Sequence, residues 1–188
     1  MPDRTPSREE ALALLHRYNV NPSLLGHARA VEATMRHFAR LRGGDEEMWG
    51  AIGLVHDLDY EQFPEQHCHQ TAAILRAEGW PESWVRATLS HGWGICTEVE
   101  PQSELEKTLY AVDELTGFVT ACALVRPSKS VRDLETRSVR KKWKQASFAA
   151  GVDRQVVERG AALLGIDLDE LTGQVIEAMR GVADEIGL

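Results

Sequence analysis

Apolar side chains recur three and four positions apart through the first third of the chain, which is the spacing of amphipathic α-helices. A first helix is expected after Ser7, because residues 7–10 (Ser-Arg-Glu-Glu) have the form of a capping box. Asn21 is a suitable cap for a second helix that begins with Pro22 and ends at residues 43–44, both glycine. Asp45 then starts a third helix.

Apolar side chains recur with the same helical spacing through the rest of the chain. A fourth helix is expected from near His67 to Gly79, and a fifth follows Pro81. A sixth follows a capping box at Ser103, and its apolar side is the most regular in the chain: Leu105, Leu109, Val112, Leu115, Val119 and Ala123. Two more are expected, over residues 153–165 and from near residue 167. No segment alternates with period two, so the sequence predicts an all-α fold.

A length of 188 residues favours one domain, and 43% hydrophobic residues are enough for a sizeable core. No apolar run approaches the ~18–20 residues of a membrane span, and residues 1–6 lack the pattern of a secretory signal. We therefore expect no membrane partner. A net charge of −8 argues against general nucleic-acid binding.

Three cysteines, Cys68, Cys96 and Cys122, form no CxxC pair, and their number is odd. A disulfide framework is therefore not expected, and a cytoplasmic location is.

His56 and Asp57 stand side by side where the third helix ends. A site that combines imidazole and carboxylate ligands suits Zn, Fe, Mn or Co. Neighbouring helical residues point about 100° apart, so both can reach one ion only at the flank or the end of a helix. Such a site needs further ligands from other helices.

Five other residues are candidate ligands: His27, His67, His69, His91 and Asp113. Asp113 is the most informative of them, because it lies on the apolar sixth helix, where an unpaired carboxylate would be costly to bury. A cation must compensate it, either a basic side chain or a metal. The surroundings of His16 and His37 suggest no site.

The order His27, His56-Asp57, Asp113 resembles the H…HD…D pattern of the HD-domain superfamily of metal-dependent phosphohydrolases. His67 and His91 are similar to the two intervening histidines of members that bind two metals. Supporting similarities lie in five segments: residues 64–75, 90–92, 111–118, 123–129 and 138–144. The likeness covers residues 20–145 approximately.

The resemblance implies an HD-domain-like helical bundle, with residues 1–188 as one domain, a core over about 20–145 and a C-terminal helical extension over 146–188. It also implies one or two divalent metal ions (Fe, Mn, Zn, Co or Mg). One metal would be held by His27, His56, Asp57 and Asp113, and a second by Asp57, His67 and His91. A single-metal version with only the first four residues is the alternative.

Two departures leave the ligand choice after the HD pair open. This chain has Cys68 and Thr71 where the family often has proline and glycine, so His69 could take the place of His67. Residues 67–69 (His-Cys-His) could instead form part of a zinc site, but no other cysteine has the spacing to complete it.

The function that the resemblance implies is hydrolysis of a phosphate ester or anhydride, in a nucleotide or a small phosphorylated metabolite, by metal-activated water. Asp57 would position that water. Asp59, one turn later, is interpreted as a general acid or base, as an orienting partner of a ligand histidine, or as part of a solvated acidic loop.

Residues 126–144 carry eight Lys and Arg against two acidic residues. Four of them could bind substrate phosphate: Arg126, Lys129, Lys141 and Lys142. The alternative is a solvated, charged helix face. Two other functions also stay open, an HD-type di-iron oxygenase and a non-catalytic, metal-stabilised binding module.

Overall fold

Capping residues set the helix starts, and the computed structural model, which describes residues 5–188, has most of them where the sequence predicts. Over these residues the chain forms ten α-helices, one short 3₁₀-helix and no β-strand, so the all-α prediction is confirmed. The elements are α1 (Arg8–Tyr18), α2 (Pro22–Arg42), α3 (Glu46–Val55), η1 (Pro64–Gln66), α4 (His69–Ala77), α5 (Glu82–Ser90), α6 (Glu104–Leu124), α7 (Thr136–Trp143), α8 (Arg154–Leu164), α9 (Leu168–Arg180) and α10 (Ala183–Ile186).

Both predicted capping boxes form. The Ser7 hydroxyl accepts a hydrogen bond from the Glu10 backbone N–H, and Ser103 does the same for Glu106. Each glutamate side chain in turn accepts from the backbone N–H of its serine. These reciprocal bonds satisfy N–H groups that a helix start otherwise leaves without a partner.

Three helical elements differ from the prediction. α4 begins at His69 rather than near His67, because Cys68 has a φ of 67° and interrupts the helical geometry. α7 lies inside the basic segment, where Val139 is its one buried residue, so its apolar pattern was too sparse to detect. α10 has only four residues and was not predicted.

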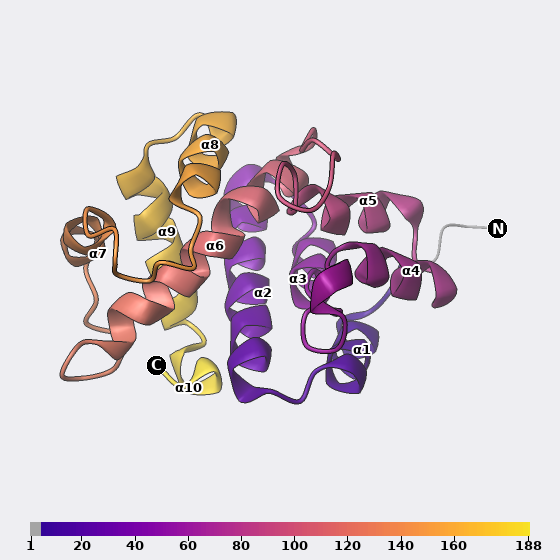
Figure 1. Ribbon diagram of the computed structural model, residues 1–188, viewed down its shortest axis with the longest axis horizontal. Coiled ribbons are helices and arrows are strands. Elements are labelled where there is room, and N and C mark those ends of the chain that lie inside the picture. Colours follow the sequence, from indigo (N-terminus) through magenta and orange to yellow (C-terminus); the bar gives the residue numbers. More distant parts are fainter. Residues whose placement is uncertain (1–4) are drawn as a thin grey trace.

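Two long helices, α2 and α6, cross at the centre of the molecule (Figure 1). α2 packs against α3, α6 and α9, and α6 also packs against α5 and α8. In Figure 1, helices α1, α3, α4 and α5 lie on one side of this crossing and α7, α8 and α9 on the other. Fully buried side chains such as Phe38, Leu115 and Phe118 fill the contacts of the two central helices.

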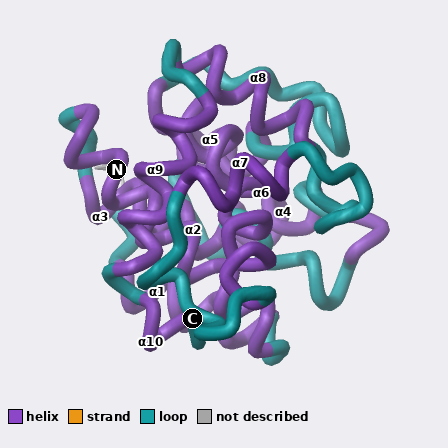
Figure 2. Tube along the Cα trace, turned by 90° about the vertical axis from the view of Figure 1, so that its left-hand side faces the viewer, coloured by secondary structure: helices purple, strands orange, loops and turns teal. Residues whose placement is uncertain are grey.

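The C-terminal helices contribute to this same core. α8 approaches α6 closely at Gly160, where a Cβ atom would lie 2.5 Å from the Cα of Ala111. Figure 2, a view turned by 90°, shows helices joined by loops throughout. No helix in the described part of the chain is both long enough and apolar enough to cross a bilayer.

Candidate metal centre

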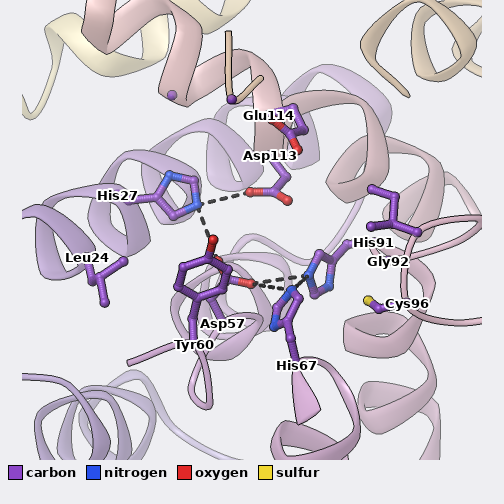
Figure 3. Close-up of a pocket in the computed structure, with 13 residues that line it drawn as sticks. Leu24, His27, Asp57, Tyr60, His67, His91, Gly92, Cys96, Asp113 and Glu114 are labelled. Atoms are coloured by element: carbon purple, nitrogen blue, oxygen red, sulfur yellow. Dashed lines mark hydrogen bonds and ion pairs between the residues drawn. The ribbon is translucent and has the colours of Figure 1, made fainter. Parts of the chain in front are cut away.

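Five separate elements bring six candidate ligands to one place, and Figure 3 shows five of these ligands: His27, Asp57, His67, His91 and Asp113. α2 carries His27, and α6 carries Asp113. His56 is the last residue of the α3 helical path and Asp57 follows it, so the pair lies at a helix end, as convergence on one ion requires. The remaining two, His67 after η1 and His91 at the end of α5, also occupy helix termini.

The first group consists of His27, His56, Asp57 and Asp113, whose ligand atoms all lie within 4.8 Å of one another. One Asp113 oxygen lies 3.0 Å from Nε2 of His27 and 3.2 Å from Nε2 of His56. Asp57 lies slightly farther away, 3.8 Å from His27 and 3.5 Å from His56. This is the set of four residues predicted to hold the first metal.

The second group consists of Asp57, His67 and His91. Oδ1 of Asp57 lies 3.2 Å from Nε2 of His91 and 3.6 Å from Nε2 of His67. The two imidazole Nε2 atoms are 3.3 Å apart. Asp57 therefore belongs to both groups and joins them.

Outward hydrogen bonds fix how these rings present their nitrogens. Nδ1 of His56 lies 2.7 Å from the carbonyl oxygen of Gly53, and Nδ1 of His91 contacts the carbonyl of Thr88. A carbonyl only accepts, so both Nδ1 atoms must donate. Nδ1 of His67 likewise donates to Asp59, at 2.9 Å. When neutral, these rings therefore direct Nε2 lone pairs at the cluster, which is the orientation of metal-ligating histidines.

With neutral histidines, the centre of the cluster would be short of hydrogen-bond donors. Oδ1 of Asp57 is buried without a hydrogen-bond partner, although three histidine Nε2 atoms surround it. Lone pairs that face a carboxylate and one another repel, so the group needs either added protons or a cation. Buried histidine and aspartate side chains arranged in this way can hold a metal ion.

The pKa values of the histidines and of Asp113 also show that positive charge is stabilised in the cluster. Burial alone lowers the pKa of His27, but the hydrogen bond and charge of Asp113 outweigh it, so the net pKa is raised. The pKa values of His56, His67 and His91 are raised in the same way, burial being outweighed by nearby carboxylates. Burial opposes ionisation of Asp113, yet the charge of His56 and the hydrogen bond of His27 hold its pKa well below the usual range.

A cavity of about 320 Å³ opens over the cluster. Its wall includes Tyr60, Ile95, Cys96 and Glu114 beside the candidate ligands, and no Lys or Arg from the described residues takes part. Burial and the negative charge of Asp113 raise the pKa of Glu114 to about 7. The cavity is therefore rich in carboxylates and imidazoles and has no fixed basic side chain.

A second cavity of about 480 Å³ adjoins the first, because both are lined by Leu24, His27 and Gly117. Its other lining residues, between α2, α6 and the C-terminal residues, include Thr120, Leu124 and Ile186, and no Asp, Glu, Lys or Arg of the described chain is among them. An ideal Cβ built at Gly117 would touch nothing within 4 Å, so the passage over this glycine is open.

Asp59 is fully buried and lines neither cavity. One of its oxygens accepts from Nδ1 of His67, and the other accepts from the backbone N–H of Thr71 at 2.8 Å. The prediction of Asp59 as a general acid or base is therefore corrected, because a carboxylate with both oxygens engaged and no access to the cavity cannot meet a substrate. Its contacts fit the other interpretation, in which it orients His67.

The choice between His67 and His69 is also resolved by geometry. His69 lies outside the cluster, where its Nε2 is 3.1 Å from the carbonyl oxygen of Cys96, while His67 faces Asp57 and His91. The prediction that no second cysteine could join Cys68 is wrong, since Cys96 reaches it from a loop 28 positions later. No spacing rule pointed to this contact, because it depends on how α4 and α5 pack.

The four predicted phosphate-binding residues do not reach the cavity over the cluster. Arg126, Lys141 and Lys142 line a separate cavity of about 390 Å³, and Lys129 lines none of these three cavities. Arg126 pairs with Asp133 at 2.8 Å. These four residues lie away from the cluster because α6 continues for about 16 Å beyond Asp113 before the basic segment begins. Their assignment as substrate ligands of this centre is corrected.

Comparison with known proteins gives no match: no protein-family model, no curated protein and no solved structure is significantly similar to the chain. The functional argument therefore depends on the geometry of the site.

Proposed function

We propose that this chain is a metal-dependent phosphohydrolase of the HD-domain type, which hydrolyses a phosphate ester or anhydride at the His/Asp cluster. One observation carries the proposal. Two groups of nitrogen and oxygen ligands share Asp57, and the outward Nδ1 bonds leave Nε2 lone pairs facing inward. Adjacent N/O sites joined by a carboxylate are the arrangement in which two divalent cations act on one phosphoryl group.

Each residue has a defined task in this proposal. His27, His56, Asp57 and Asp113 would hold one cation, and His67, His91 and Asp57 a second. Bound there, the cations would supply Lewis acidity and lower the pKa of a water molecule towards neutrality. Asp59 would keep the imidazole of His67 in its ligating orientation through the bond to Nδ1.

The cavities indicate which substrates fit best. No basic side chain of the described residues lines the cavity, so the cations themselves must balance the charge of the phosphate. Two divalent cations carry a charge of +4, and the carboxylates of Asp57 and Asp113 offset half of it, so the remainder balances one phosphate monoester rather than several phosphates. The best match is therefore a molecule with a single phosphate group and an uncharged organic part, which would extend across Gly117 into the second cavity.

The lack of Lys and Arg at the cavity also favours a second candidate, a di-iron oxygenase with the same ligands. Oxygen chemistry needs no basic residue to bind phosphate, and imidazole with carboxylate suits iron. Activity that requires Fe²⁺ and dioxygen, without phosphatase activity in Mn²⁺ or Mg²⁺, would replace the first candidate by this one.

The test begins with elemental analysis of protein purified without added metal. The chelator-treated protein is then assayed with Mn²⁺, Fe²⁺, Co²⁺, Zn²⁺ and Mg²⁺ against a panel of phosphate monoesters, nucleoside polyphosphates and p-nitrophenyl phosphate. We expect one or two metal equivalents, and phosphate release that is strongest with phosphate monoesters whose organic part is uncharged. Substitution of Asp57→Ala removes the residue that both groups share, so metal occupancy and turnover should be lost together.

His69→Ala is a matched control, because His69 lies two residues from a candidate ligand but outside the cluster. It should keep both the metal and the activity. Full activity of the Asp57→Ala protein would refute the proposal. Bound metal without phosphate release or oxygen consumption in the wild-type protein would instead identify a non-catalytic module.

A further inference from the structure

Two cysteine side chains meet beside the His67 and His91 segments. The Sγ atoms of Cys68 and Cys96 are 2.6 Å apart, closer than two unbonded sulfur atoms normally approach. Cys68 follows His67 directly, and its sulfur lies 3.8 Å from Nε2 of His91. Figure 3 shows Cys96 beside Gly92 and His91, at the edge of the cavity. Nothing in the proposed phosphate chemistry requires either thiol.

Backbone structure on both sides holds the sulfurs together. Residues 92–97 form a tight loop in which the N–H groups of Cys96 and Thr97 both donate to the carbonyl of Gly92, at 2.9 and 3.0 Å. The hydroxyl of Thr97 fixes the loop to α5 through the carbonyl of Leu89. Cys96 therefore occupies a defined position.

Two backbone positions are adapted to this contact. A Cβ atom at Gly92 would overlap both sulfur atoms, so only glycine leaves room for them. Cys68 has a φ of 67°, in the left-handed region that favours glycine, yet it carries a side chain and directs it at Cys96. Such a conformation in a residue other than glycine is costly and persists only where the surrounding structure imposes it.

The distance distinguishes two kinds of thiol site. Two cysteines that share a tetrahedral zinc, with Zn–S bonds of about 2.3 Å, have sulfurs about 3.8 Å apart. A covalent bond brings them to about 2.05 Å. The observed separation of the two sulfurs exceeds a disulfide bond length by about half an ångström. It falls short of the separation in a zinc site by more than an ångström, so the geometry is nearer to a disulfide.

We propose that Cys68 and Cys96 form a reversible disulfide bond when the protein meets a hydroperoxide. Cys96 is the thiol that an oxidant reaches, because it is partly exposed and lines the cavity, whereas Cys68 is buried. The inference goes beyond the proposed hydrolase activity and does not depend on it.

The chemistry balances in two steps. The Cys96 sulfur, having lost its proton, attacks the peroxide; an S–O bond forms, the O–O bond breaks, and one water (or alcohol) leaves with that proton. The Cys68 sulfur then attacks the sulfenic sulfur; the S–S bond forms, the S–O bond breaks, and the hydroxyl leaves as water with the Cys68 proton. Two thiols lose two electrons and two protons, and the peroxide is reduced. A dithiol reductant reverses the change.

The disulfide would tie the turn before α4 to the loop after α5. These are the segments that carry His67 and His91, so the covalent bond would fix the spacing between the two.

The test uses the full-length protein, fully reduced and then treated with hydrogen peroxide. Thiols are counted in denaturant with Ellman's reagent, and the count is expected to fall from three to one, Cys122 being the one that stays free. Trypsin cleavage without reduction should yield peptides 43–76 and 87–107 linked to each other, two hydrogen masses lighter than their sum. Dithiothreitol should separate them.

Variants give matched controls. Cys122→Ser should fall from two thiols to none, whereas Cys96→Ser should keep both of its thiols and give no linked peptide. Gly92→Ala should slow linkage by separating the sulfurs, and its circular dichroism spectrum shows whether it is folded. Three free thiols after peroxide, a sulfinic acid on peptide 87–107 without linkage, or linkage through Cys122 would each overturn the proposal. Zinc that is released only by thiol alkylation would also overturn it, since it would show that the pair binds metal.

Discussion

The His/Asp cluster and the basic segment 126–144 are joined by α6, but the charges of their side chains are balanced in opposite ways. In the segment, arginines are paired with carboxylates near the surface: Arg126 with Asp133, Arg132 with Asp184, Arg137 with Glu135 and Arg140 with Asp169. In the cluster, Asp57 and Asp113 are held by histidines alone among the described residues. Exposed pairs of the first kind contribute little to stability. The buried carboxylates of Asp57 and Asp113 have no Lys or Arg partner within residues 5–188, so a bound cation or protonated histidines must balance their charge.

Two aspartates make this contrast testable. Asp113→Ala removes a ligand oxygen that both His27 and His56 face, so we expect loss of bound metal and of activity to background. Asp133→Ala removes an exposed partner of Arg126 and Ser128 outside the cluster, so bound metal and activity should stay unchanged and the urea midpoint should shift little. Elemental analysis and urea unfolding measure both. If the two substitutions changed bound metal and activity equally, Asp113 would not be a metal ligand.

Asp59→Asn should have the next largest effect. The amide oxygen can still accept from Nδ1 of His67, but the NH2 group then faces the backbone N–H of Thr71, and the charge that makes the imidazole a stronger ligand is lost. We expect metal affinity or activity to fall by about 10- to 100-fold. Because Asp59 is a positioning residue, the loss should appear in metal affinity and be relieved at high metal concentration. A fall in turnover at full metal occupancy would contradict this role.

The stability of the metal-free protein should depend on pH through the groups of the cluster rather than through the exposed ion pairs of the basic segment. The raised pKa values of His27, His56, His67 and His91 stabilise the fold fully below the unfolded pKa of about 6.5. That stability is lost as the pH rises through the raised values. At the acid end, the lowered pKa of Asp113 contributes stability above about pH 3.9, which is lost as the pH falls.

Urea unfolding between about pH 6 and pH 9 should therefore show the metal-free protein weakening towards alkaline pH. A divalent cation should abolish this loss and release protons as it binds, because it replaces the protons on the histidines. Asp113→Ala should flatten the metal-free profile. A profile that is identical with and without metal would contradict the assignment of the cluster.

Gly117 gives the smallest expected effect. Ala at this helical position would meet no neighbour, and its better helix propensity should raise the unfolding free energy by about 1 kcal/mol. Gly117→Leu should instead narrow the passage between the two cavities, so KM should rise for monoesters with large organic groups and stay unchanged for small ones. Uniform changes across substrates would show that the second cavity is not used.

Much of the fold was predictable because local signals determine it. Serine, asparagine and aspartate caps set the starts of α1, α2, α3 and α6, and apolar periodicity defined their buried sides. The ligand set of the cluster was predicted differently, from the resemblance of the order His27, His56-Asp57, Asp113 to the HD-domain pattern, because helix positions alone gave only a list of separate candidates.

What could not be predicted depends on contacts between distant segments. The sequence offered the orienting role of Asp59 only as one of several interpretations, and the contact of Cys68 with Cys96 was not predicted, because both contacts follow from how loops pack and no periodicity records that. The basic segment misled for a related reason. Its charge is visible in the sequence, but α6 rises by about 16 Å between Asp113 and the start of the segment and so carries these charges away from the cluster.

The close approach of Gly160 to Ala111 bears on how the chain can be divided. Ala111 lies two residues before Asp113, so α8 supports the stretch of α6 that presents this carboxylate. A protein truncated after residue 145 would leave that stretch uncovered, and its apolar side would face water. Residues beyond 145 therefore support the position of Asp113, and a shortened version of the protein should retain them.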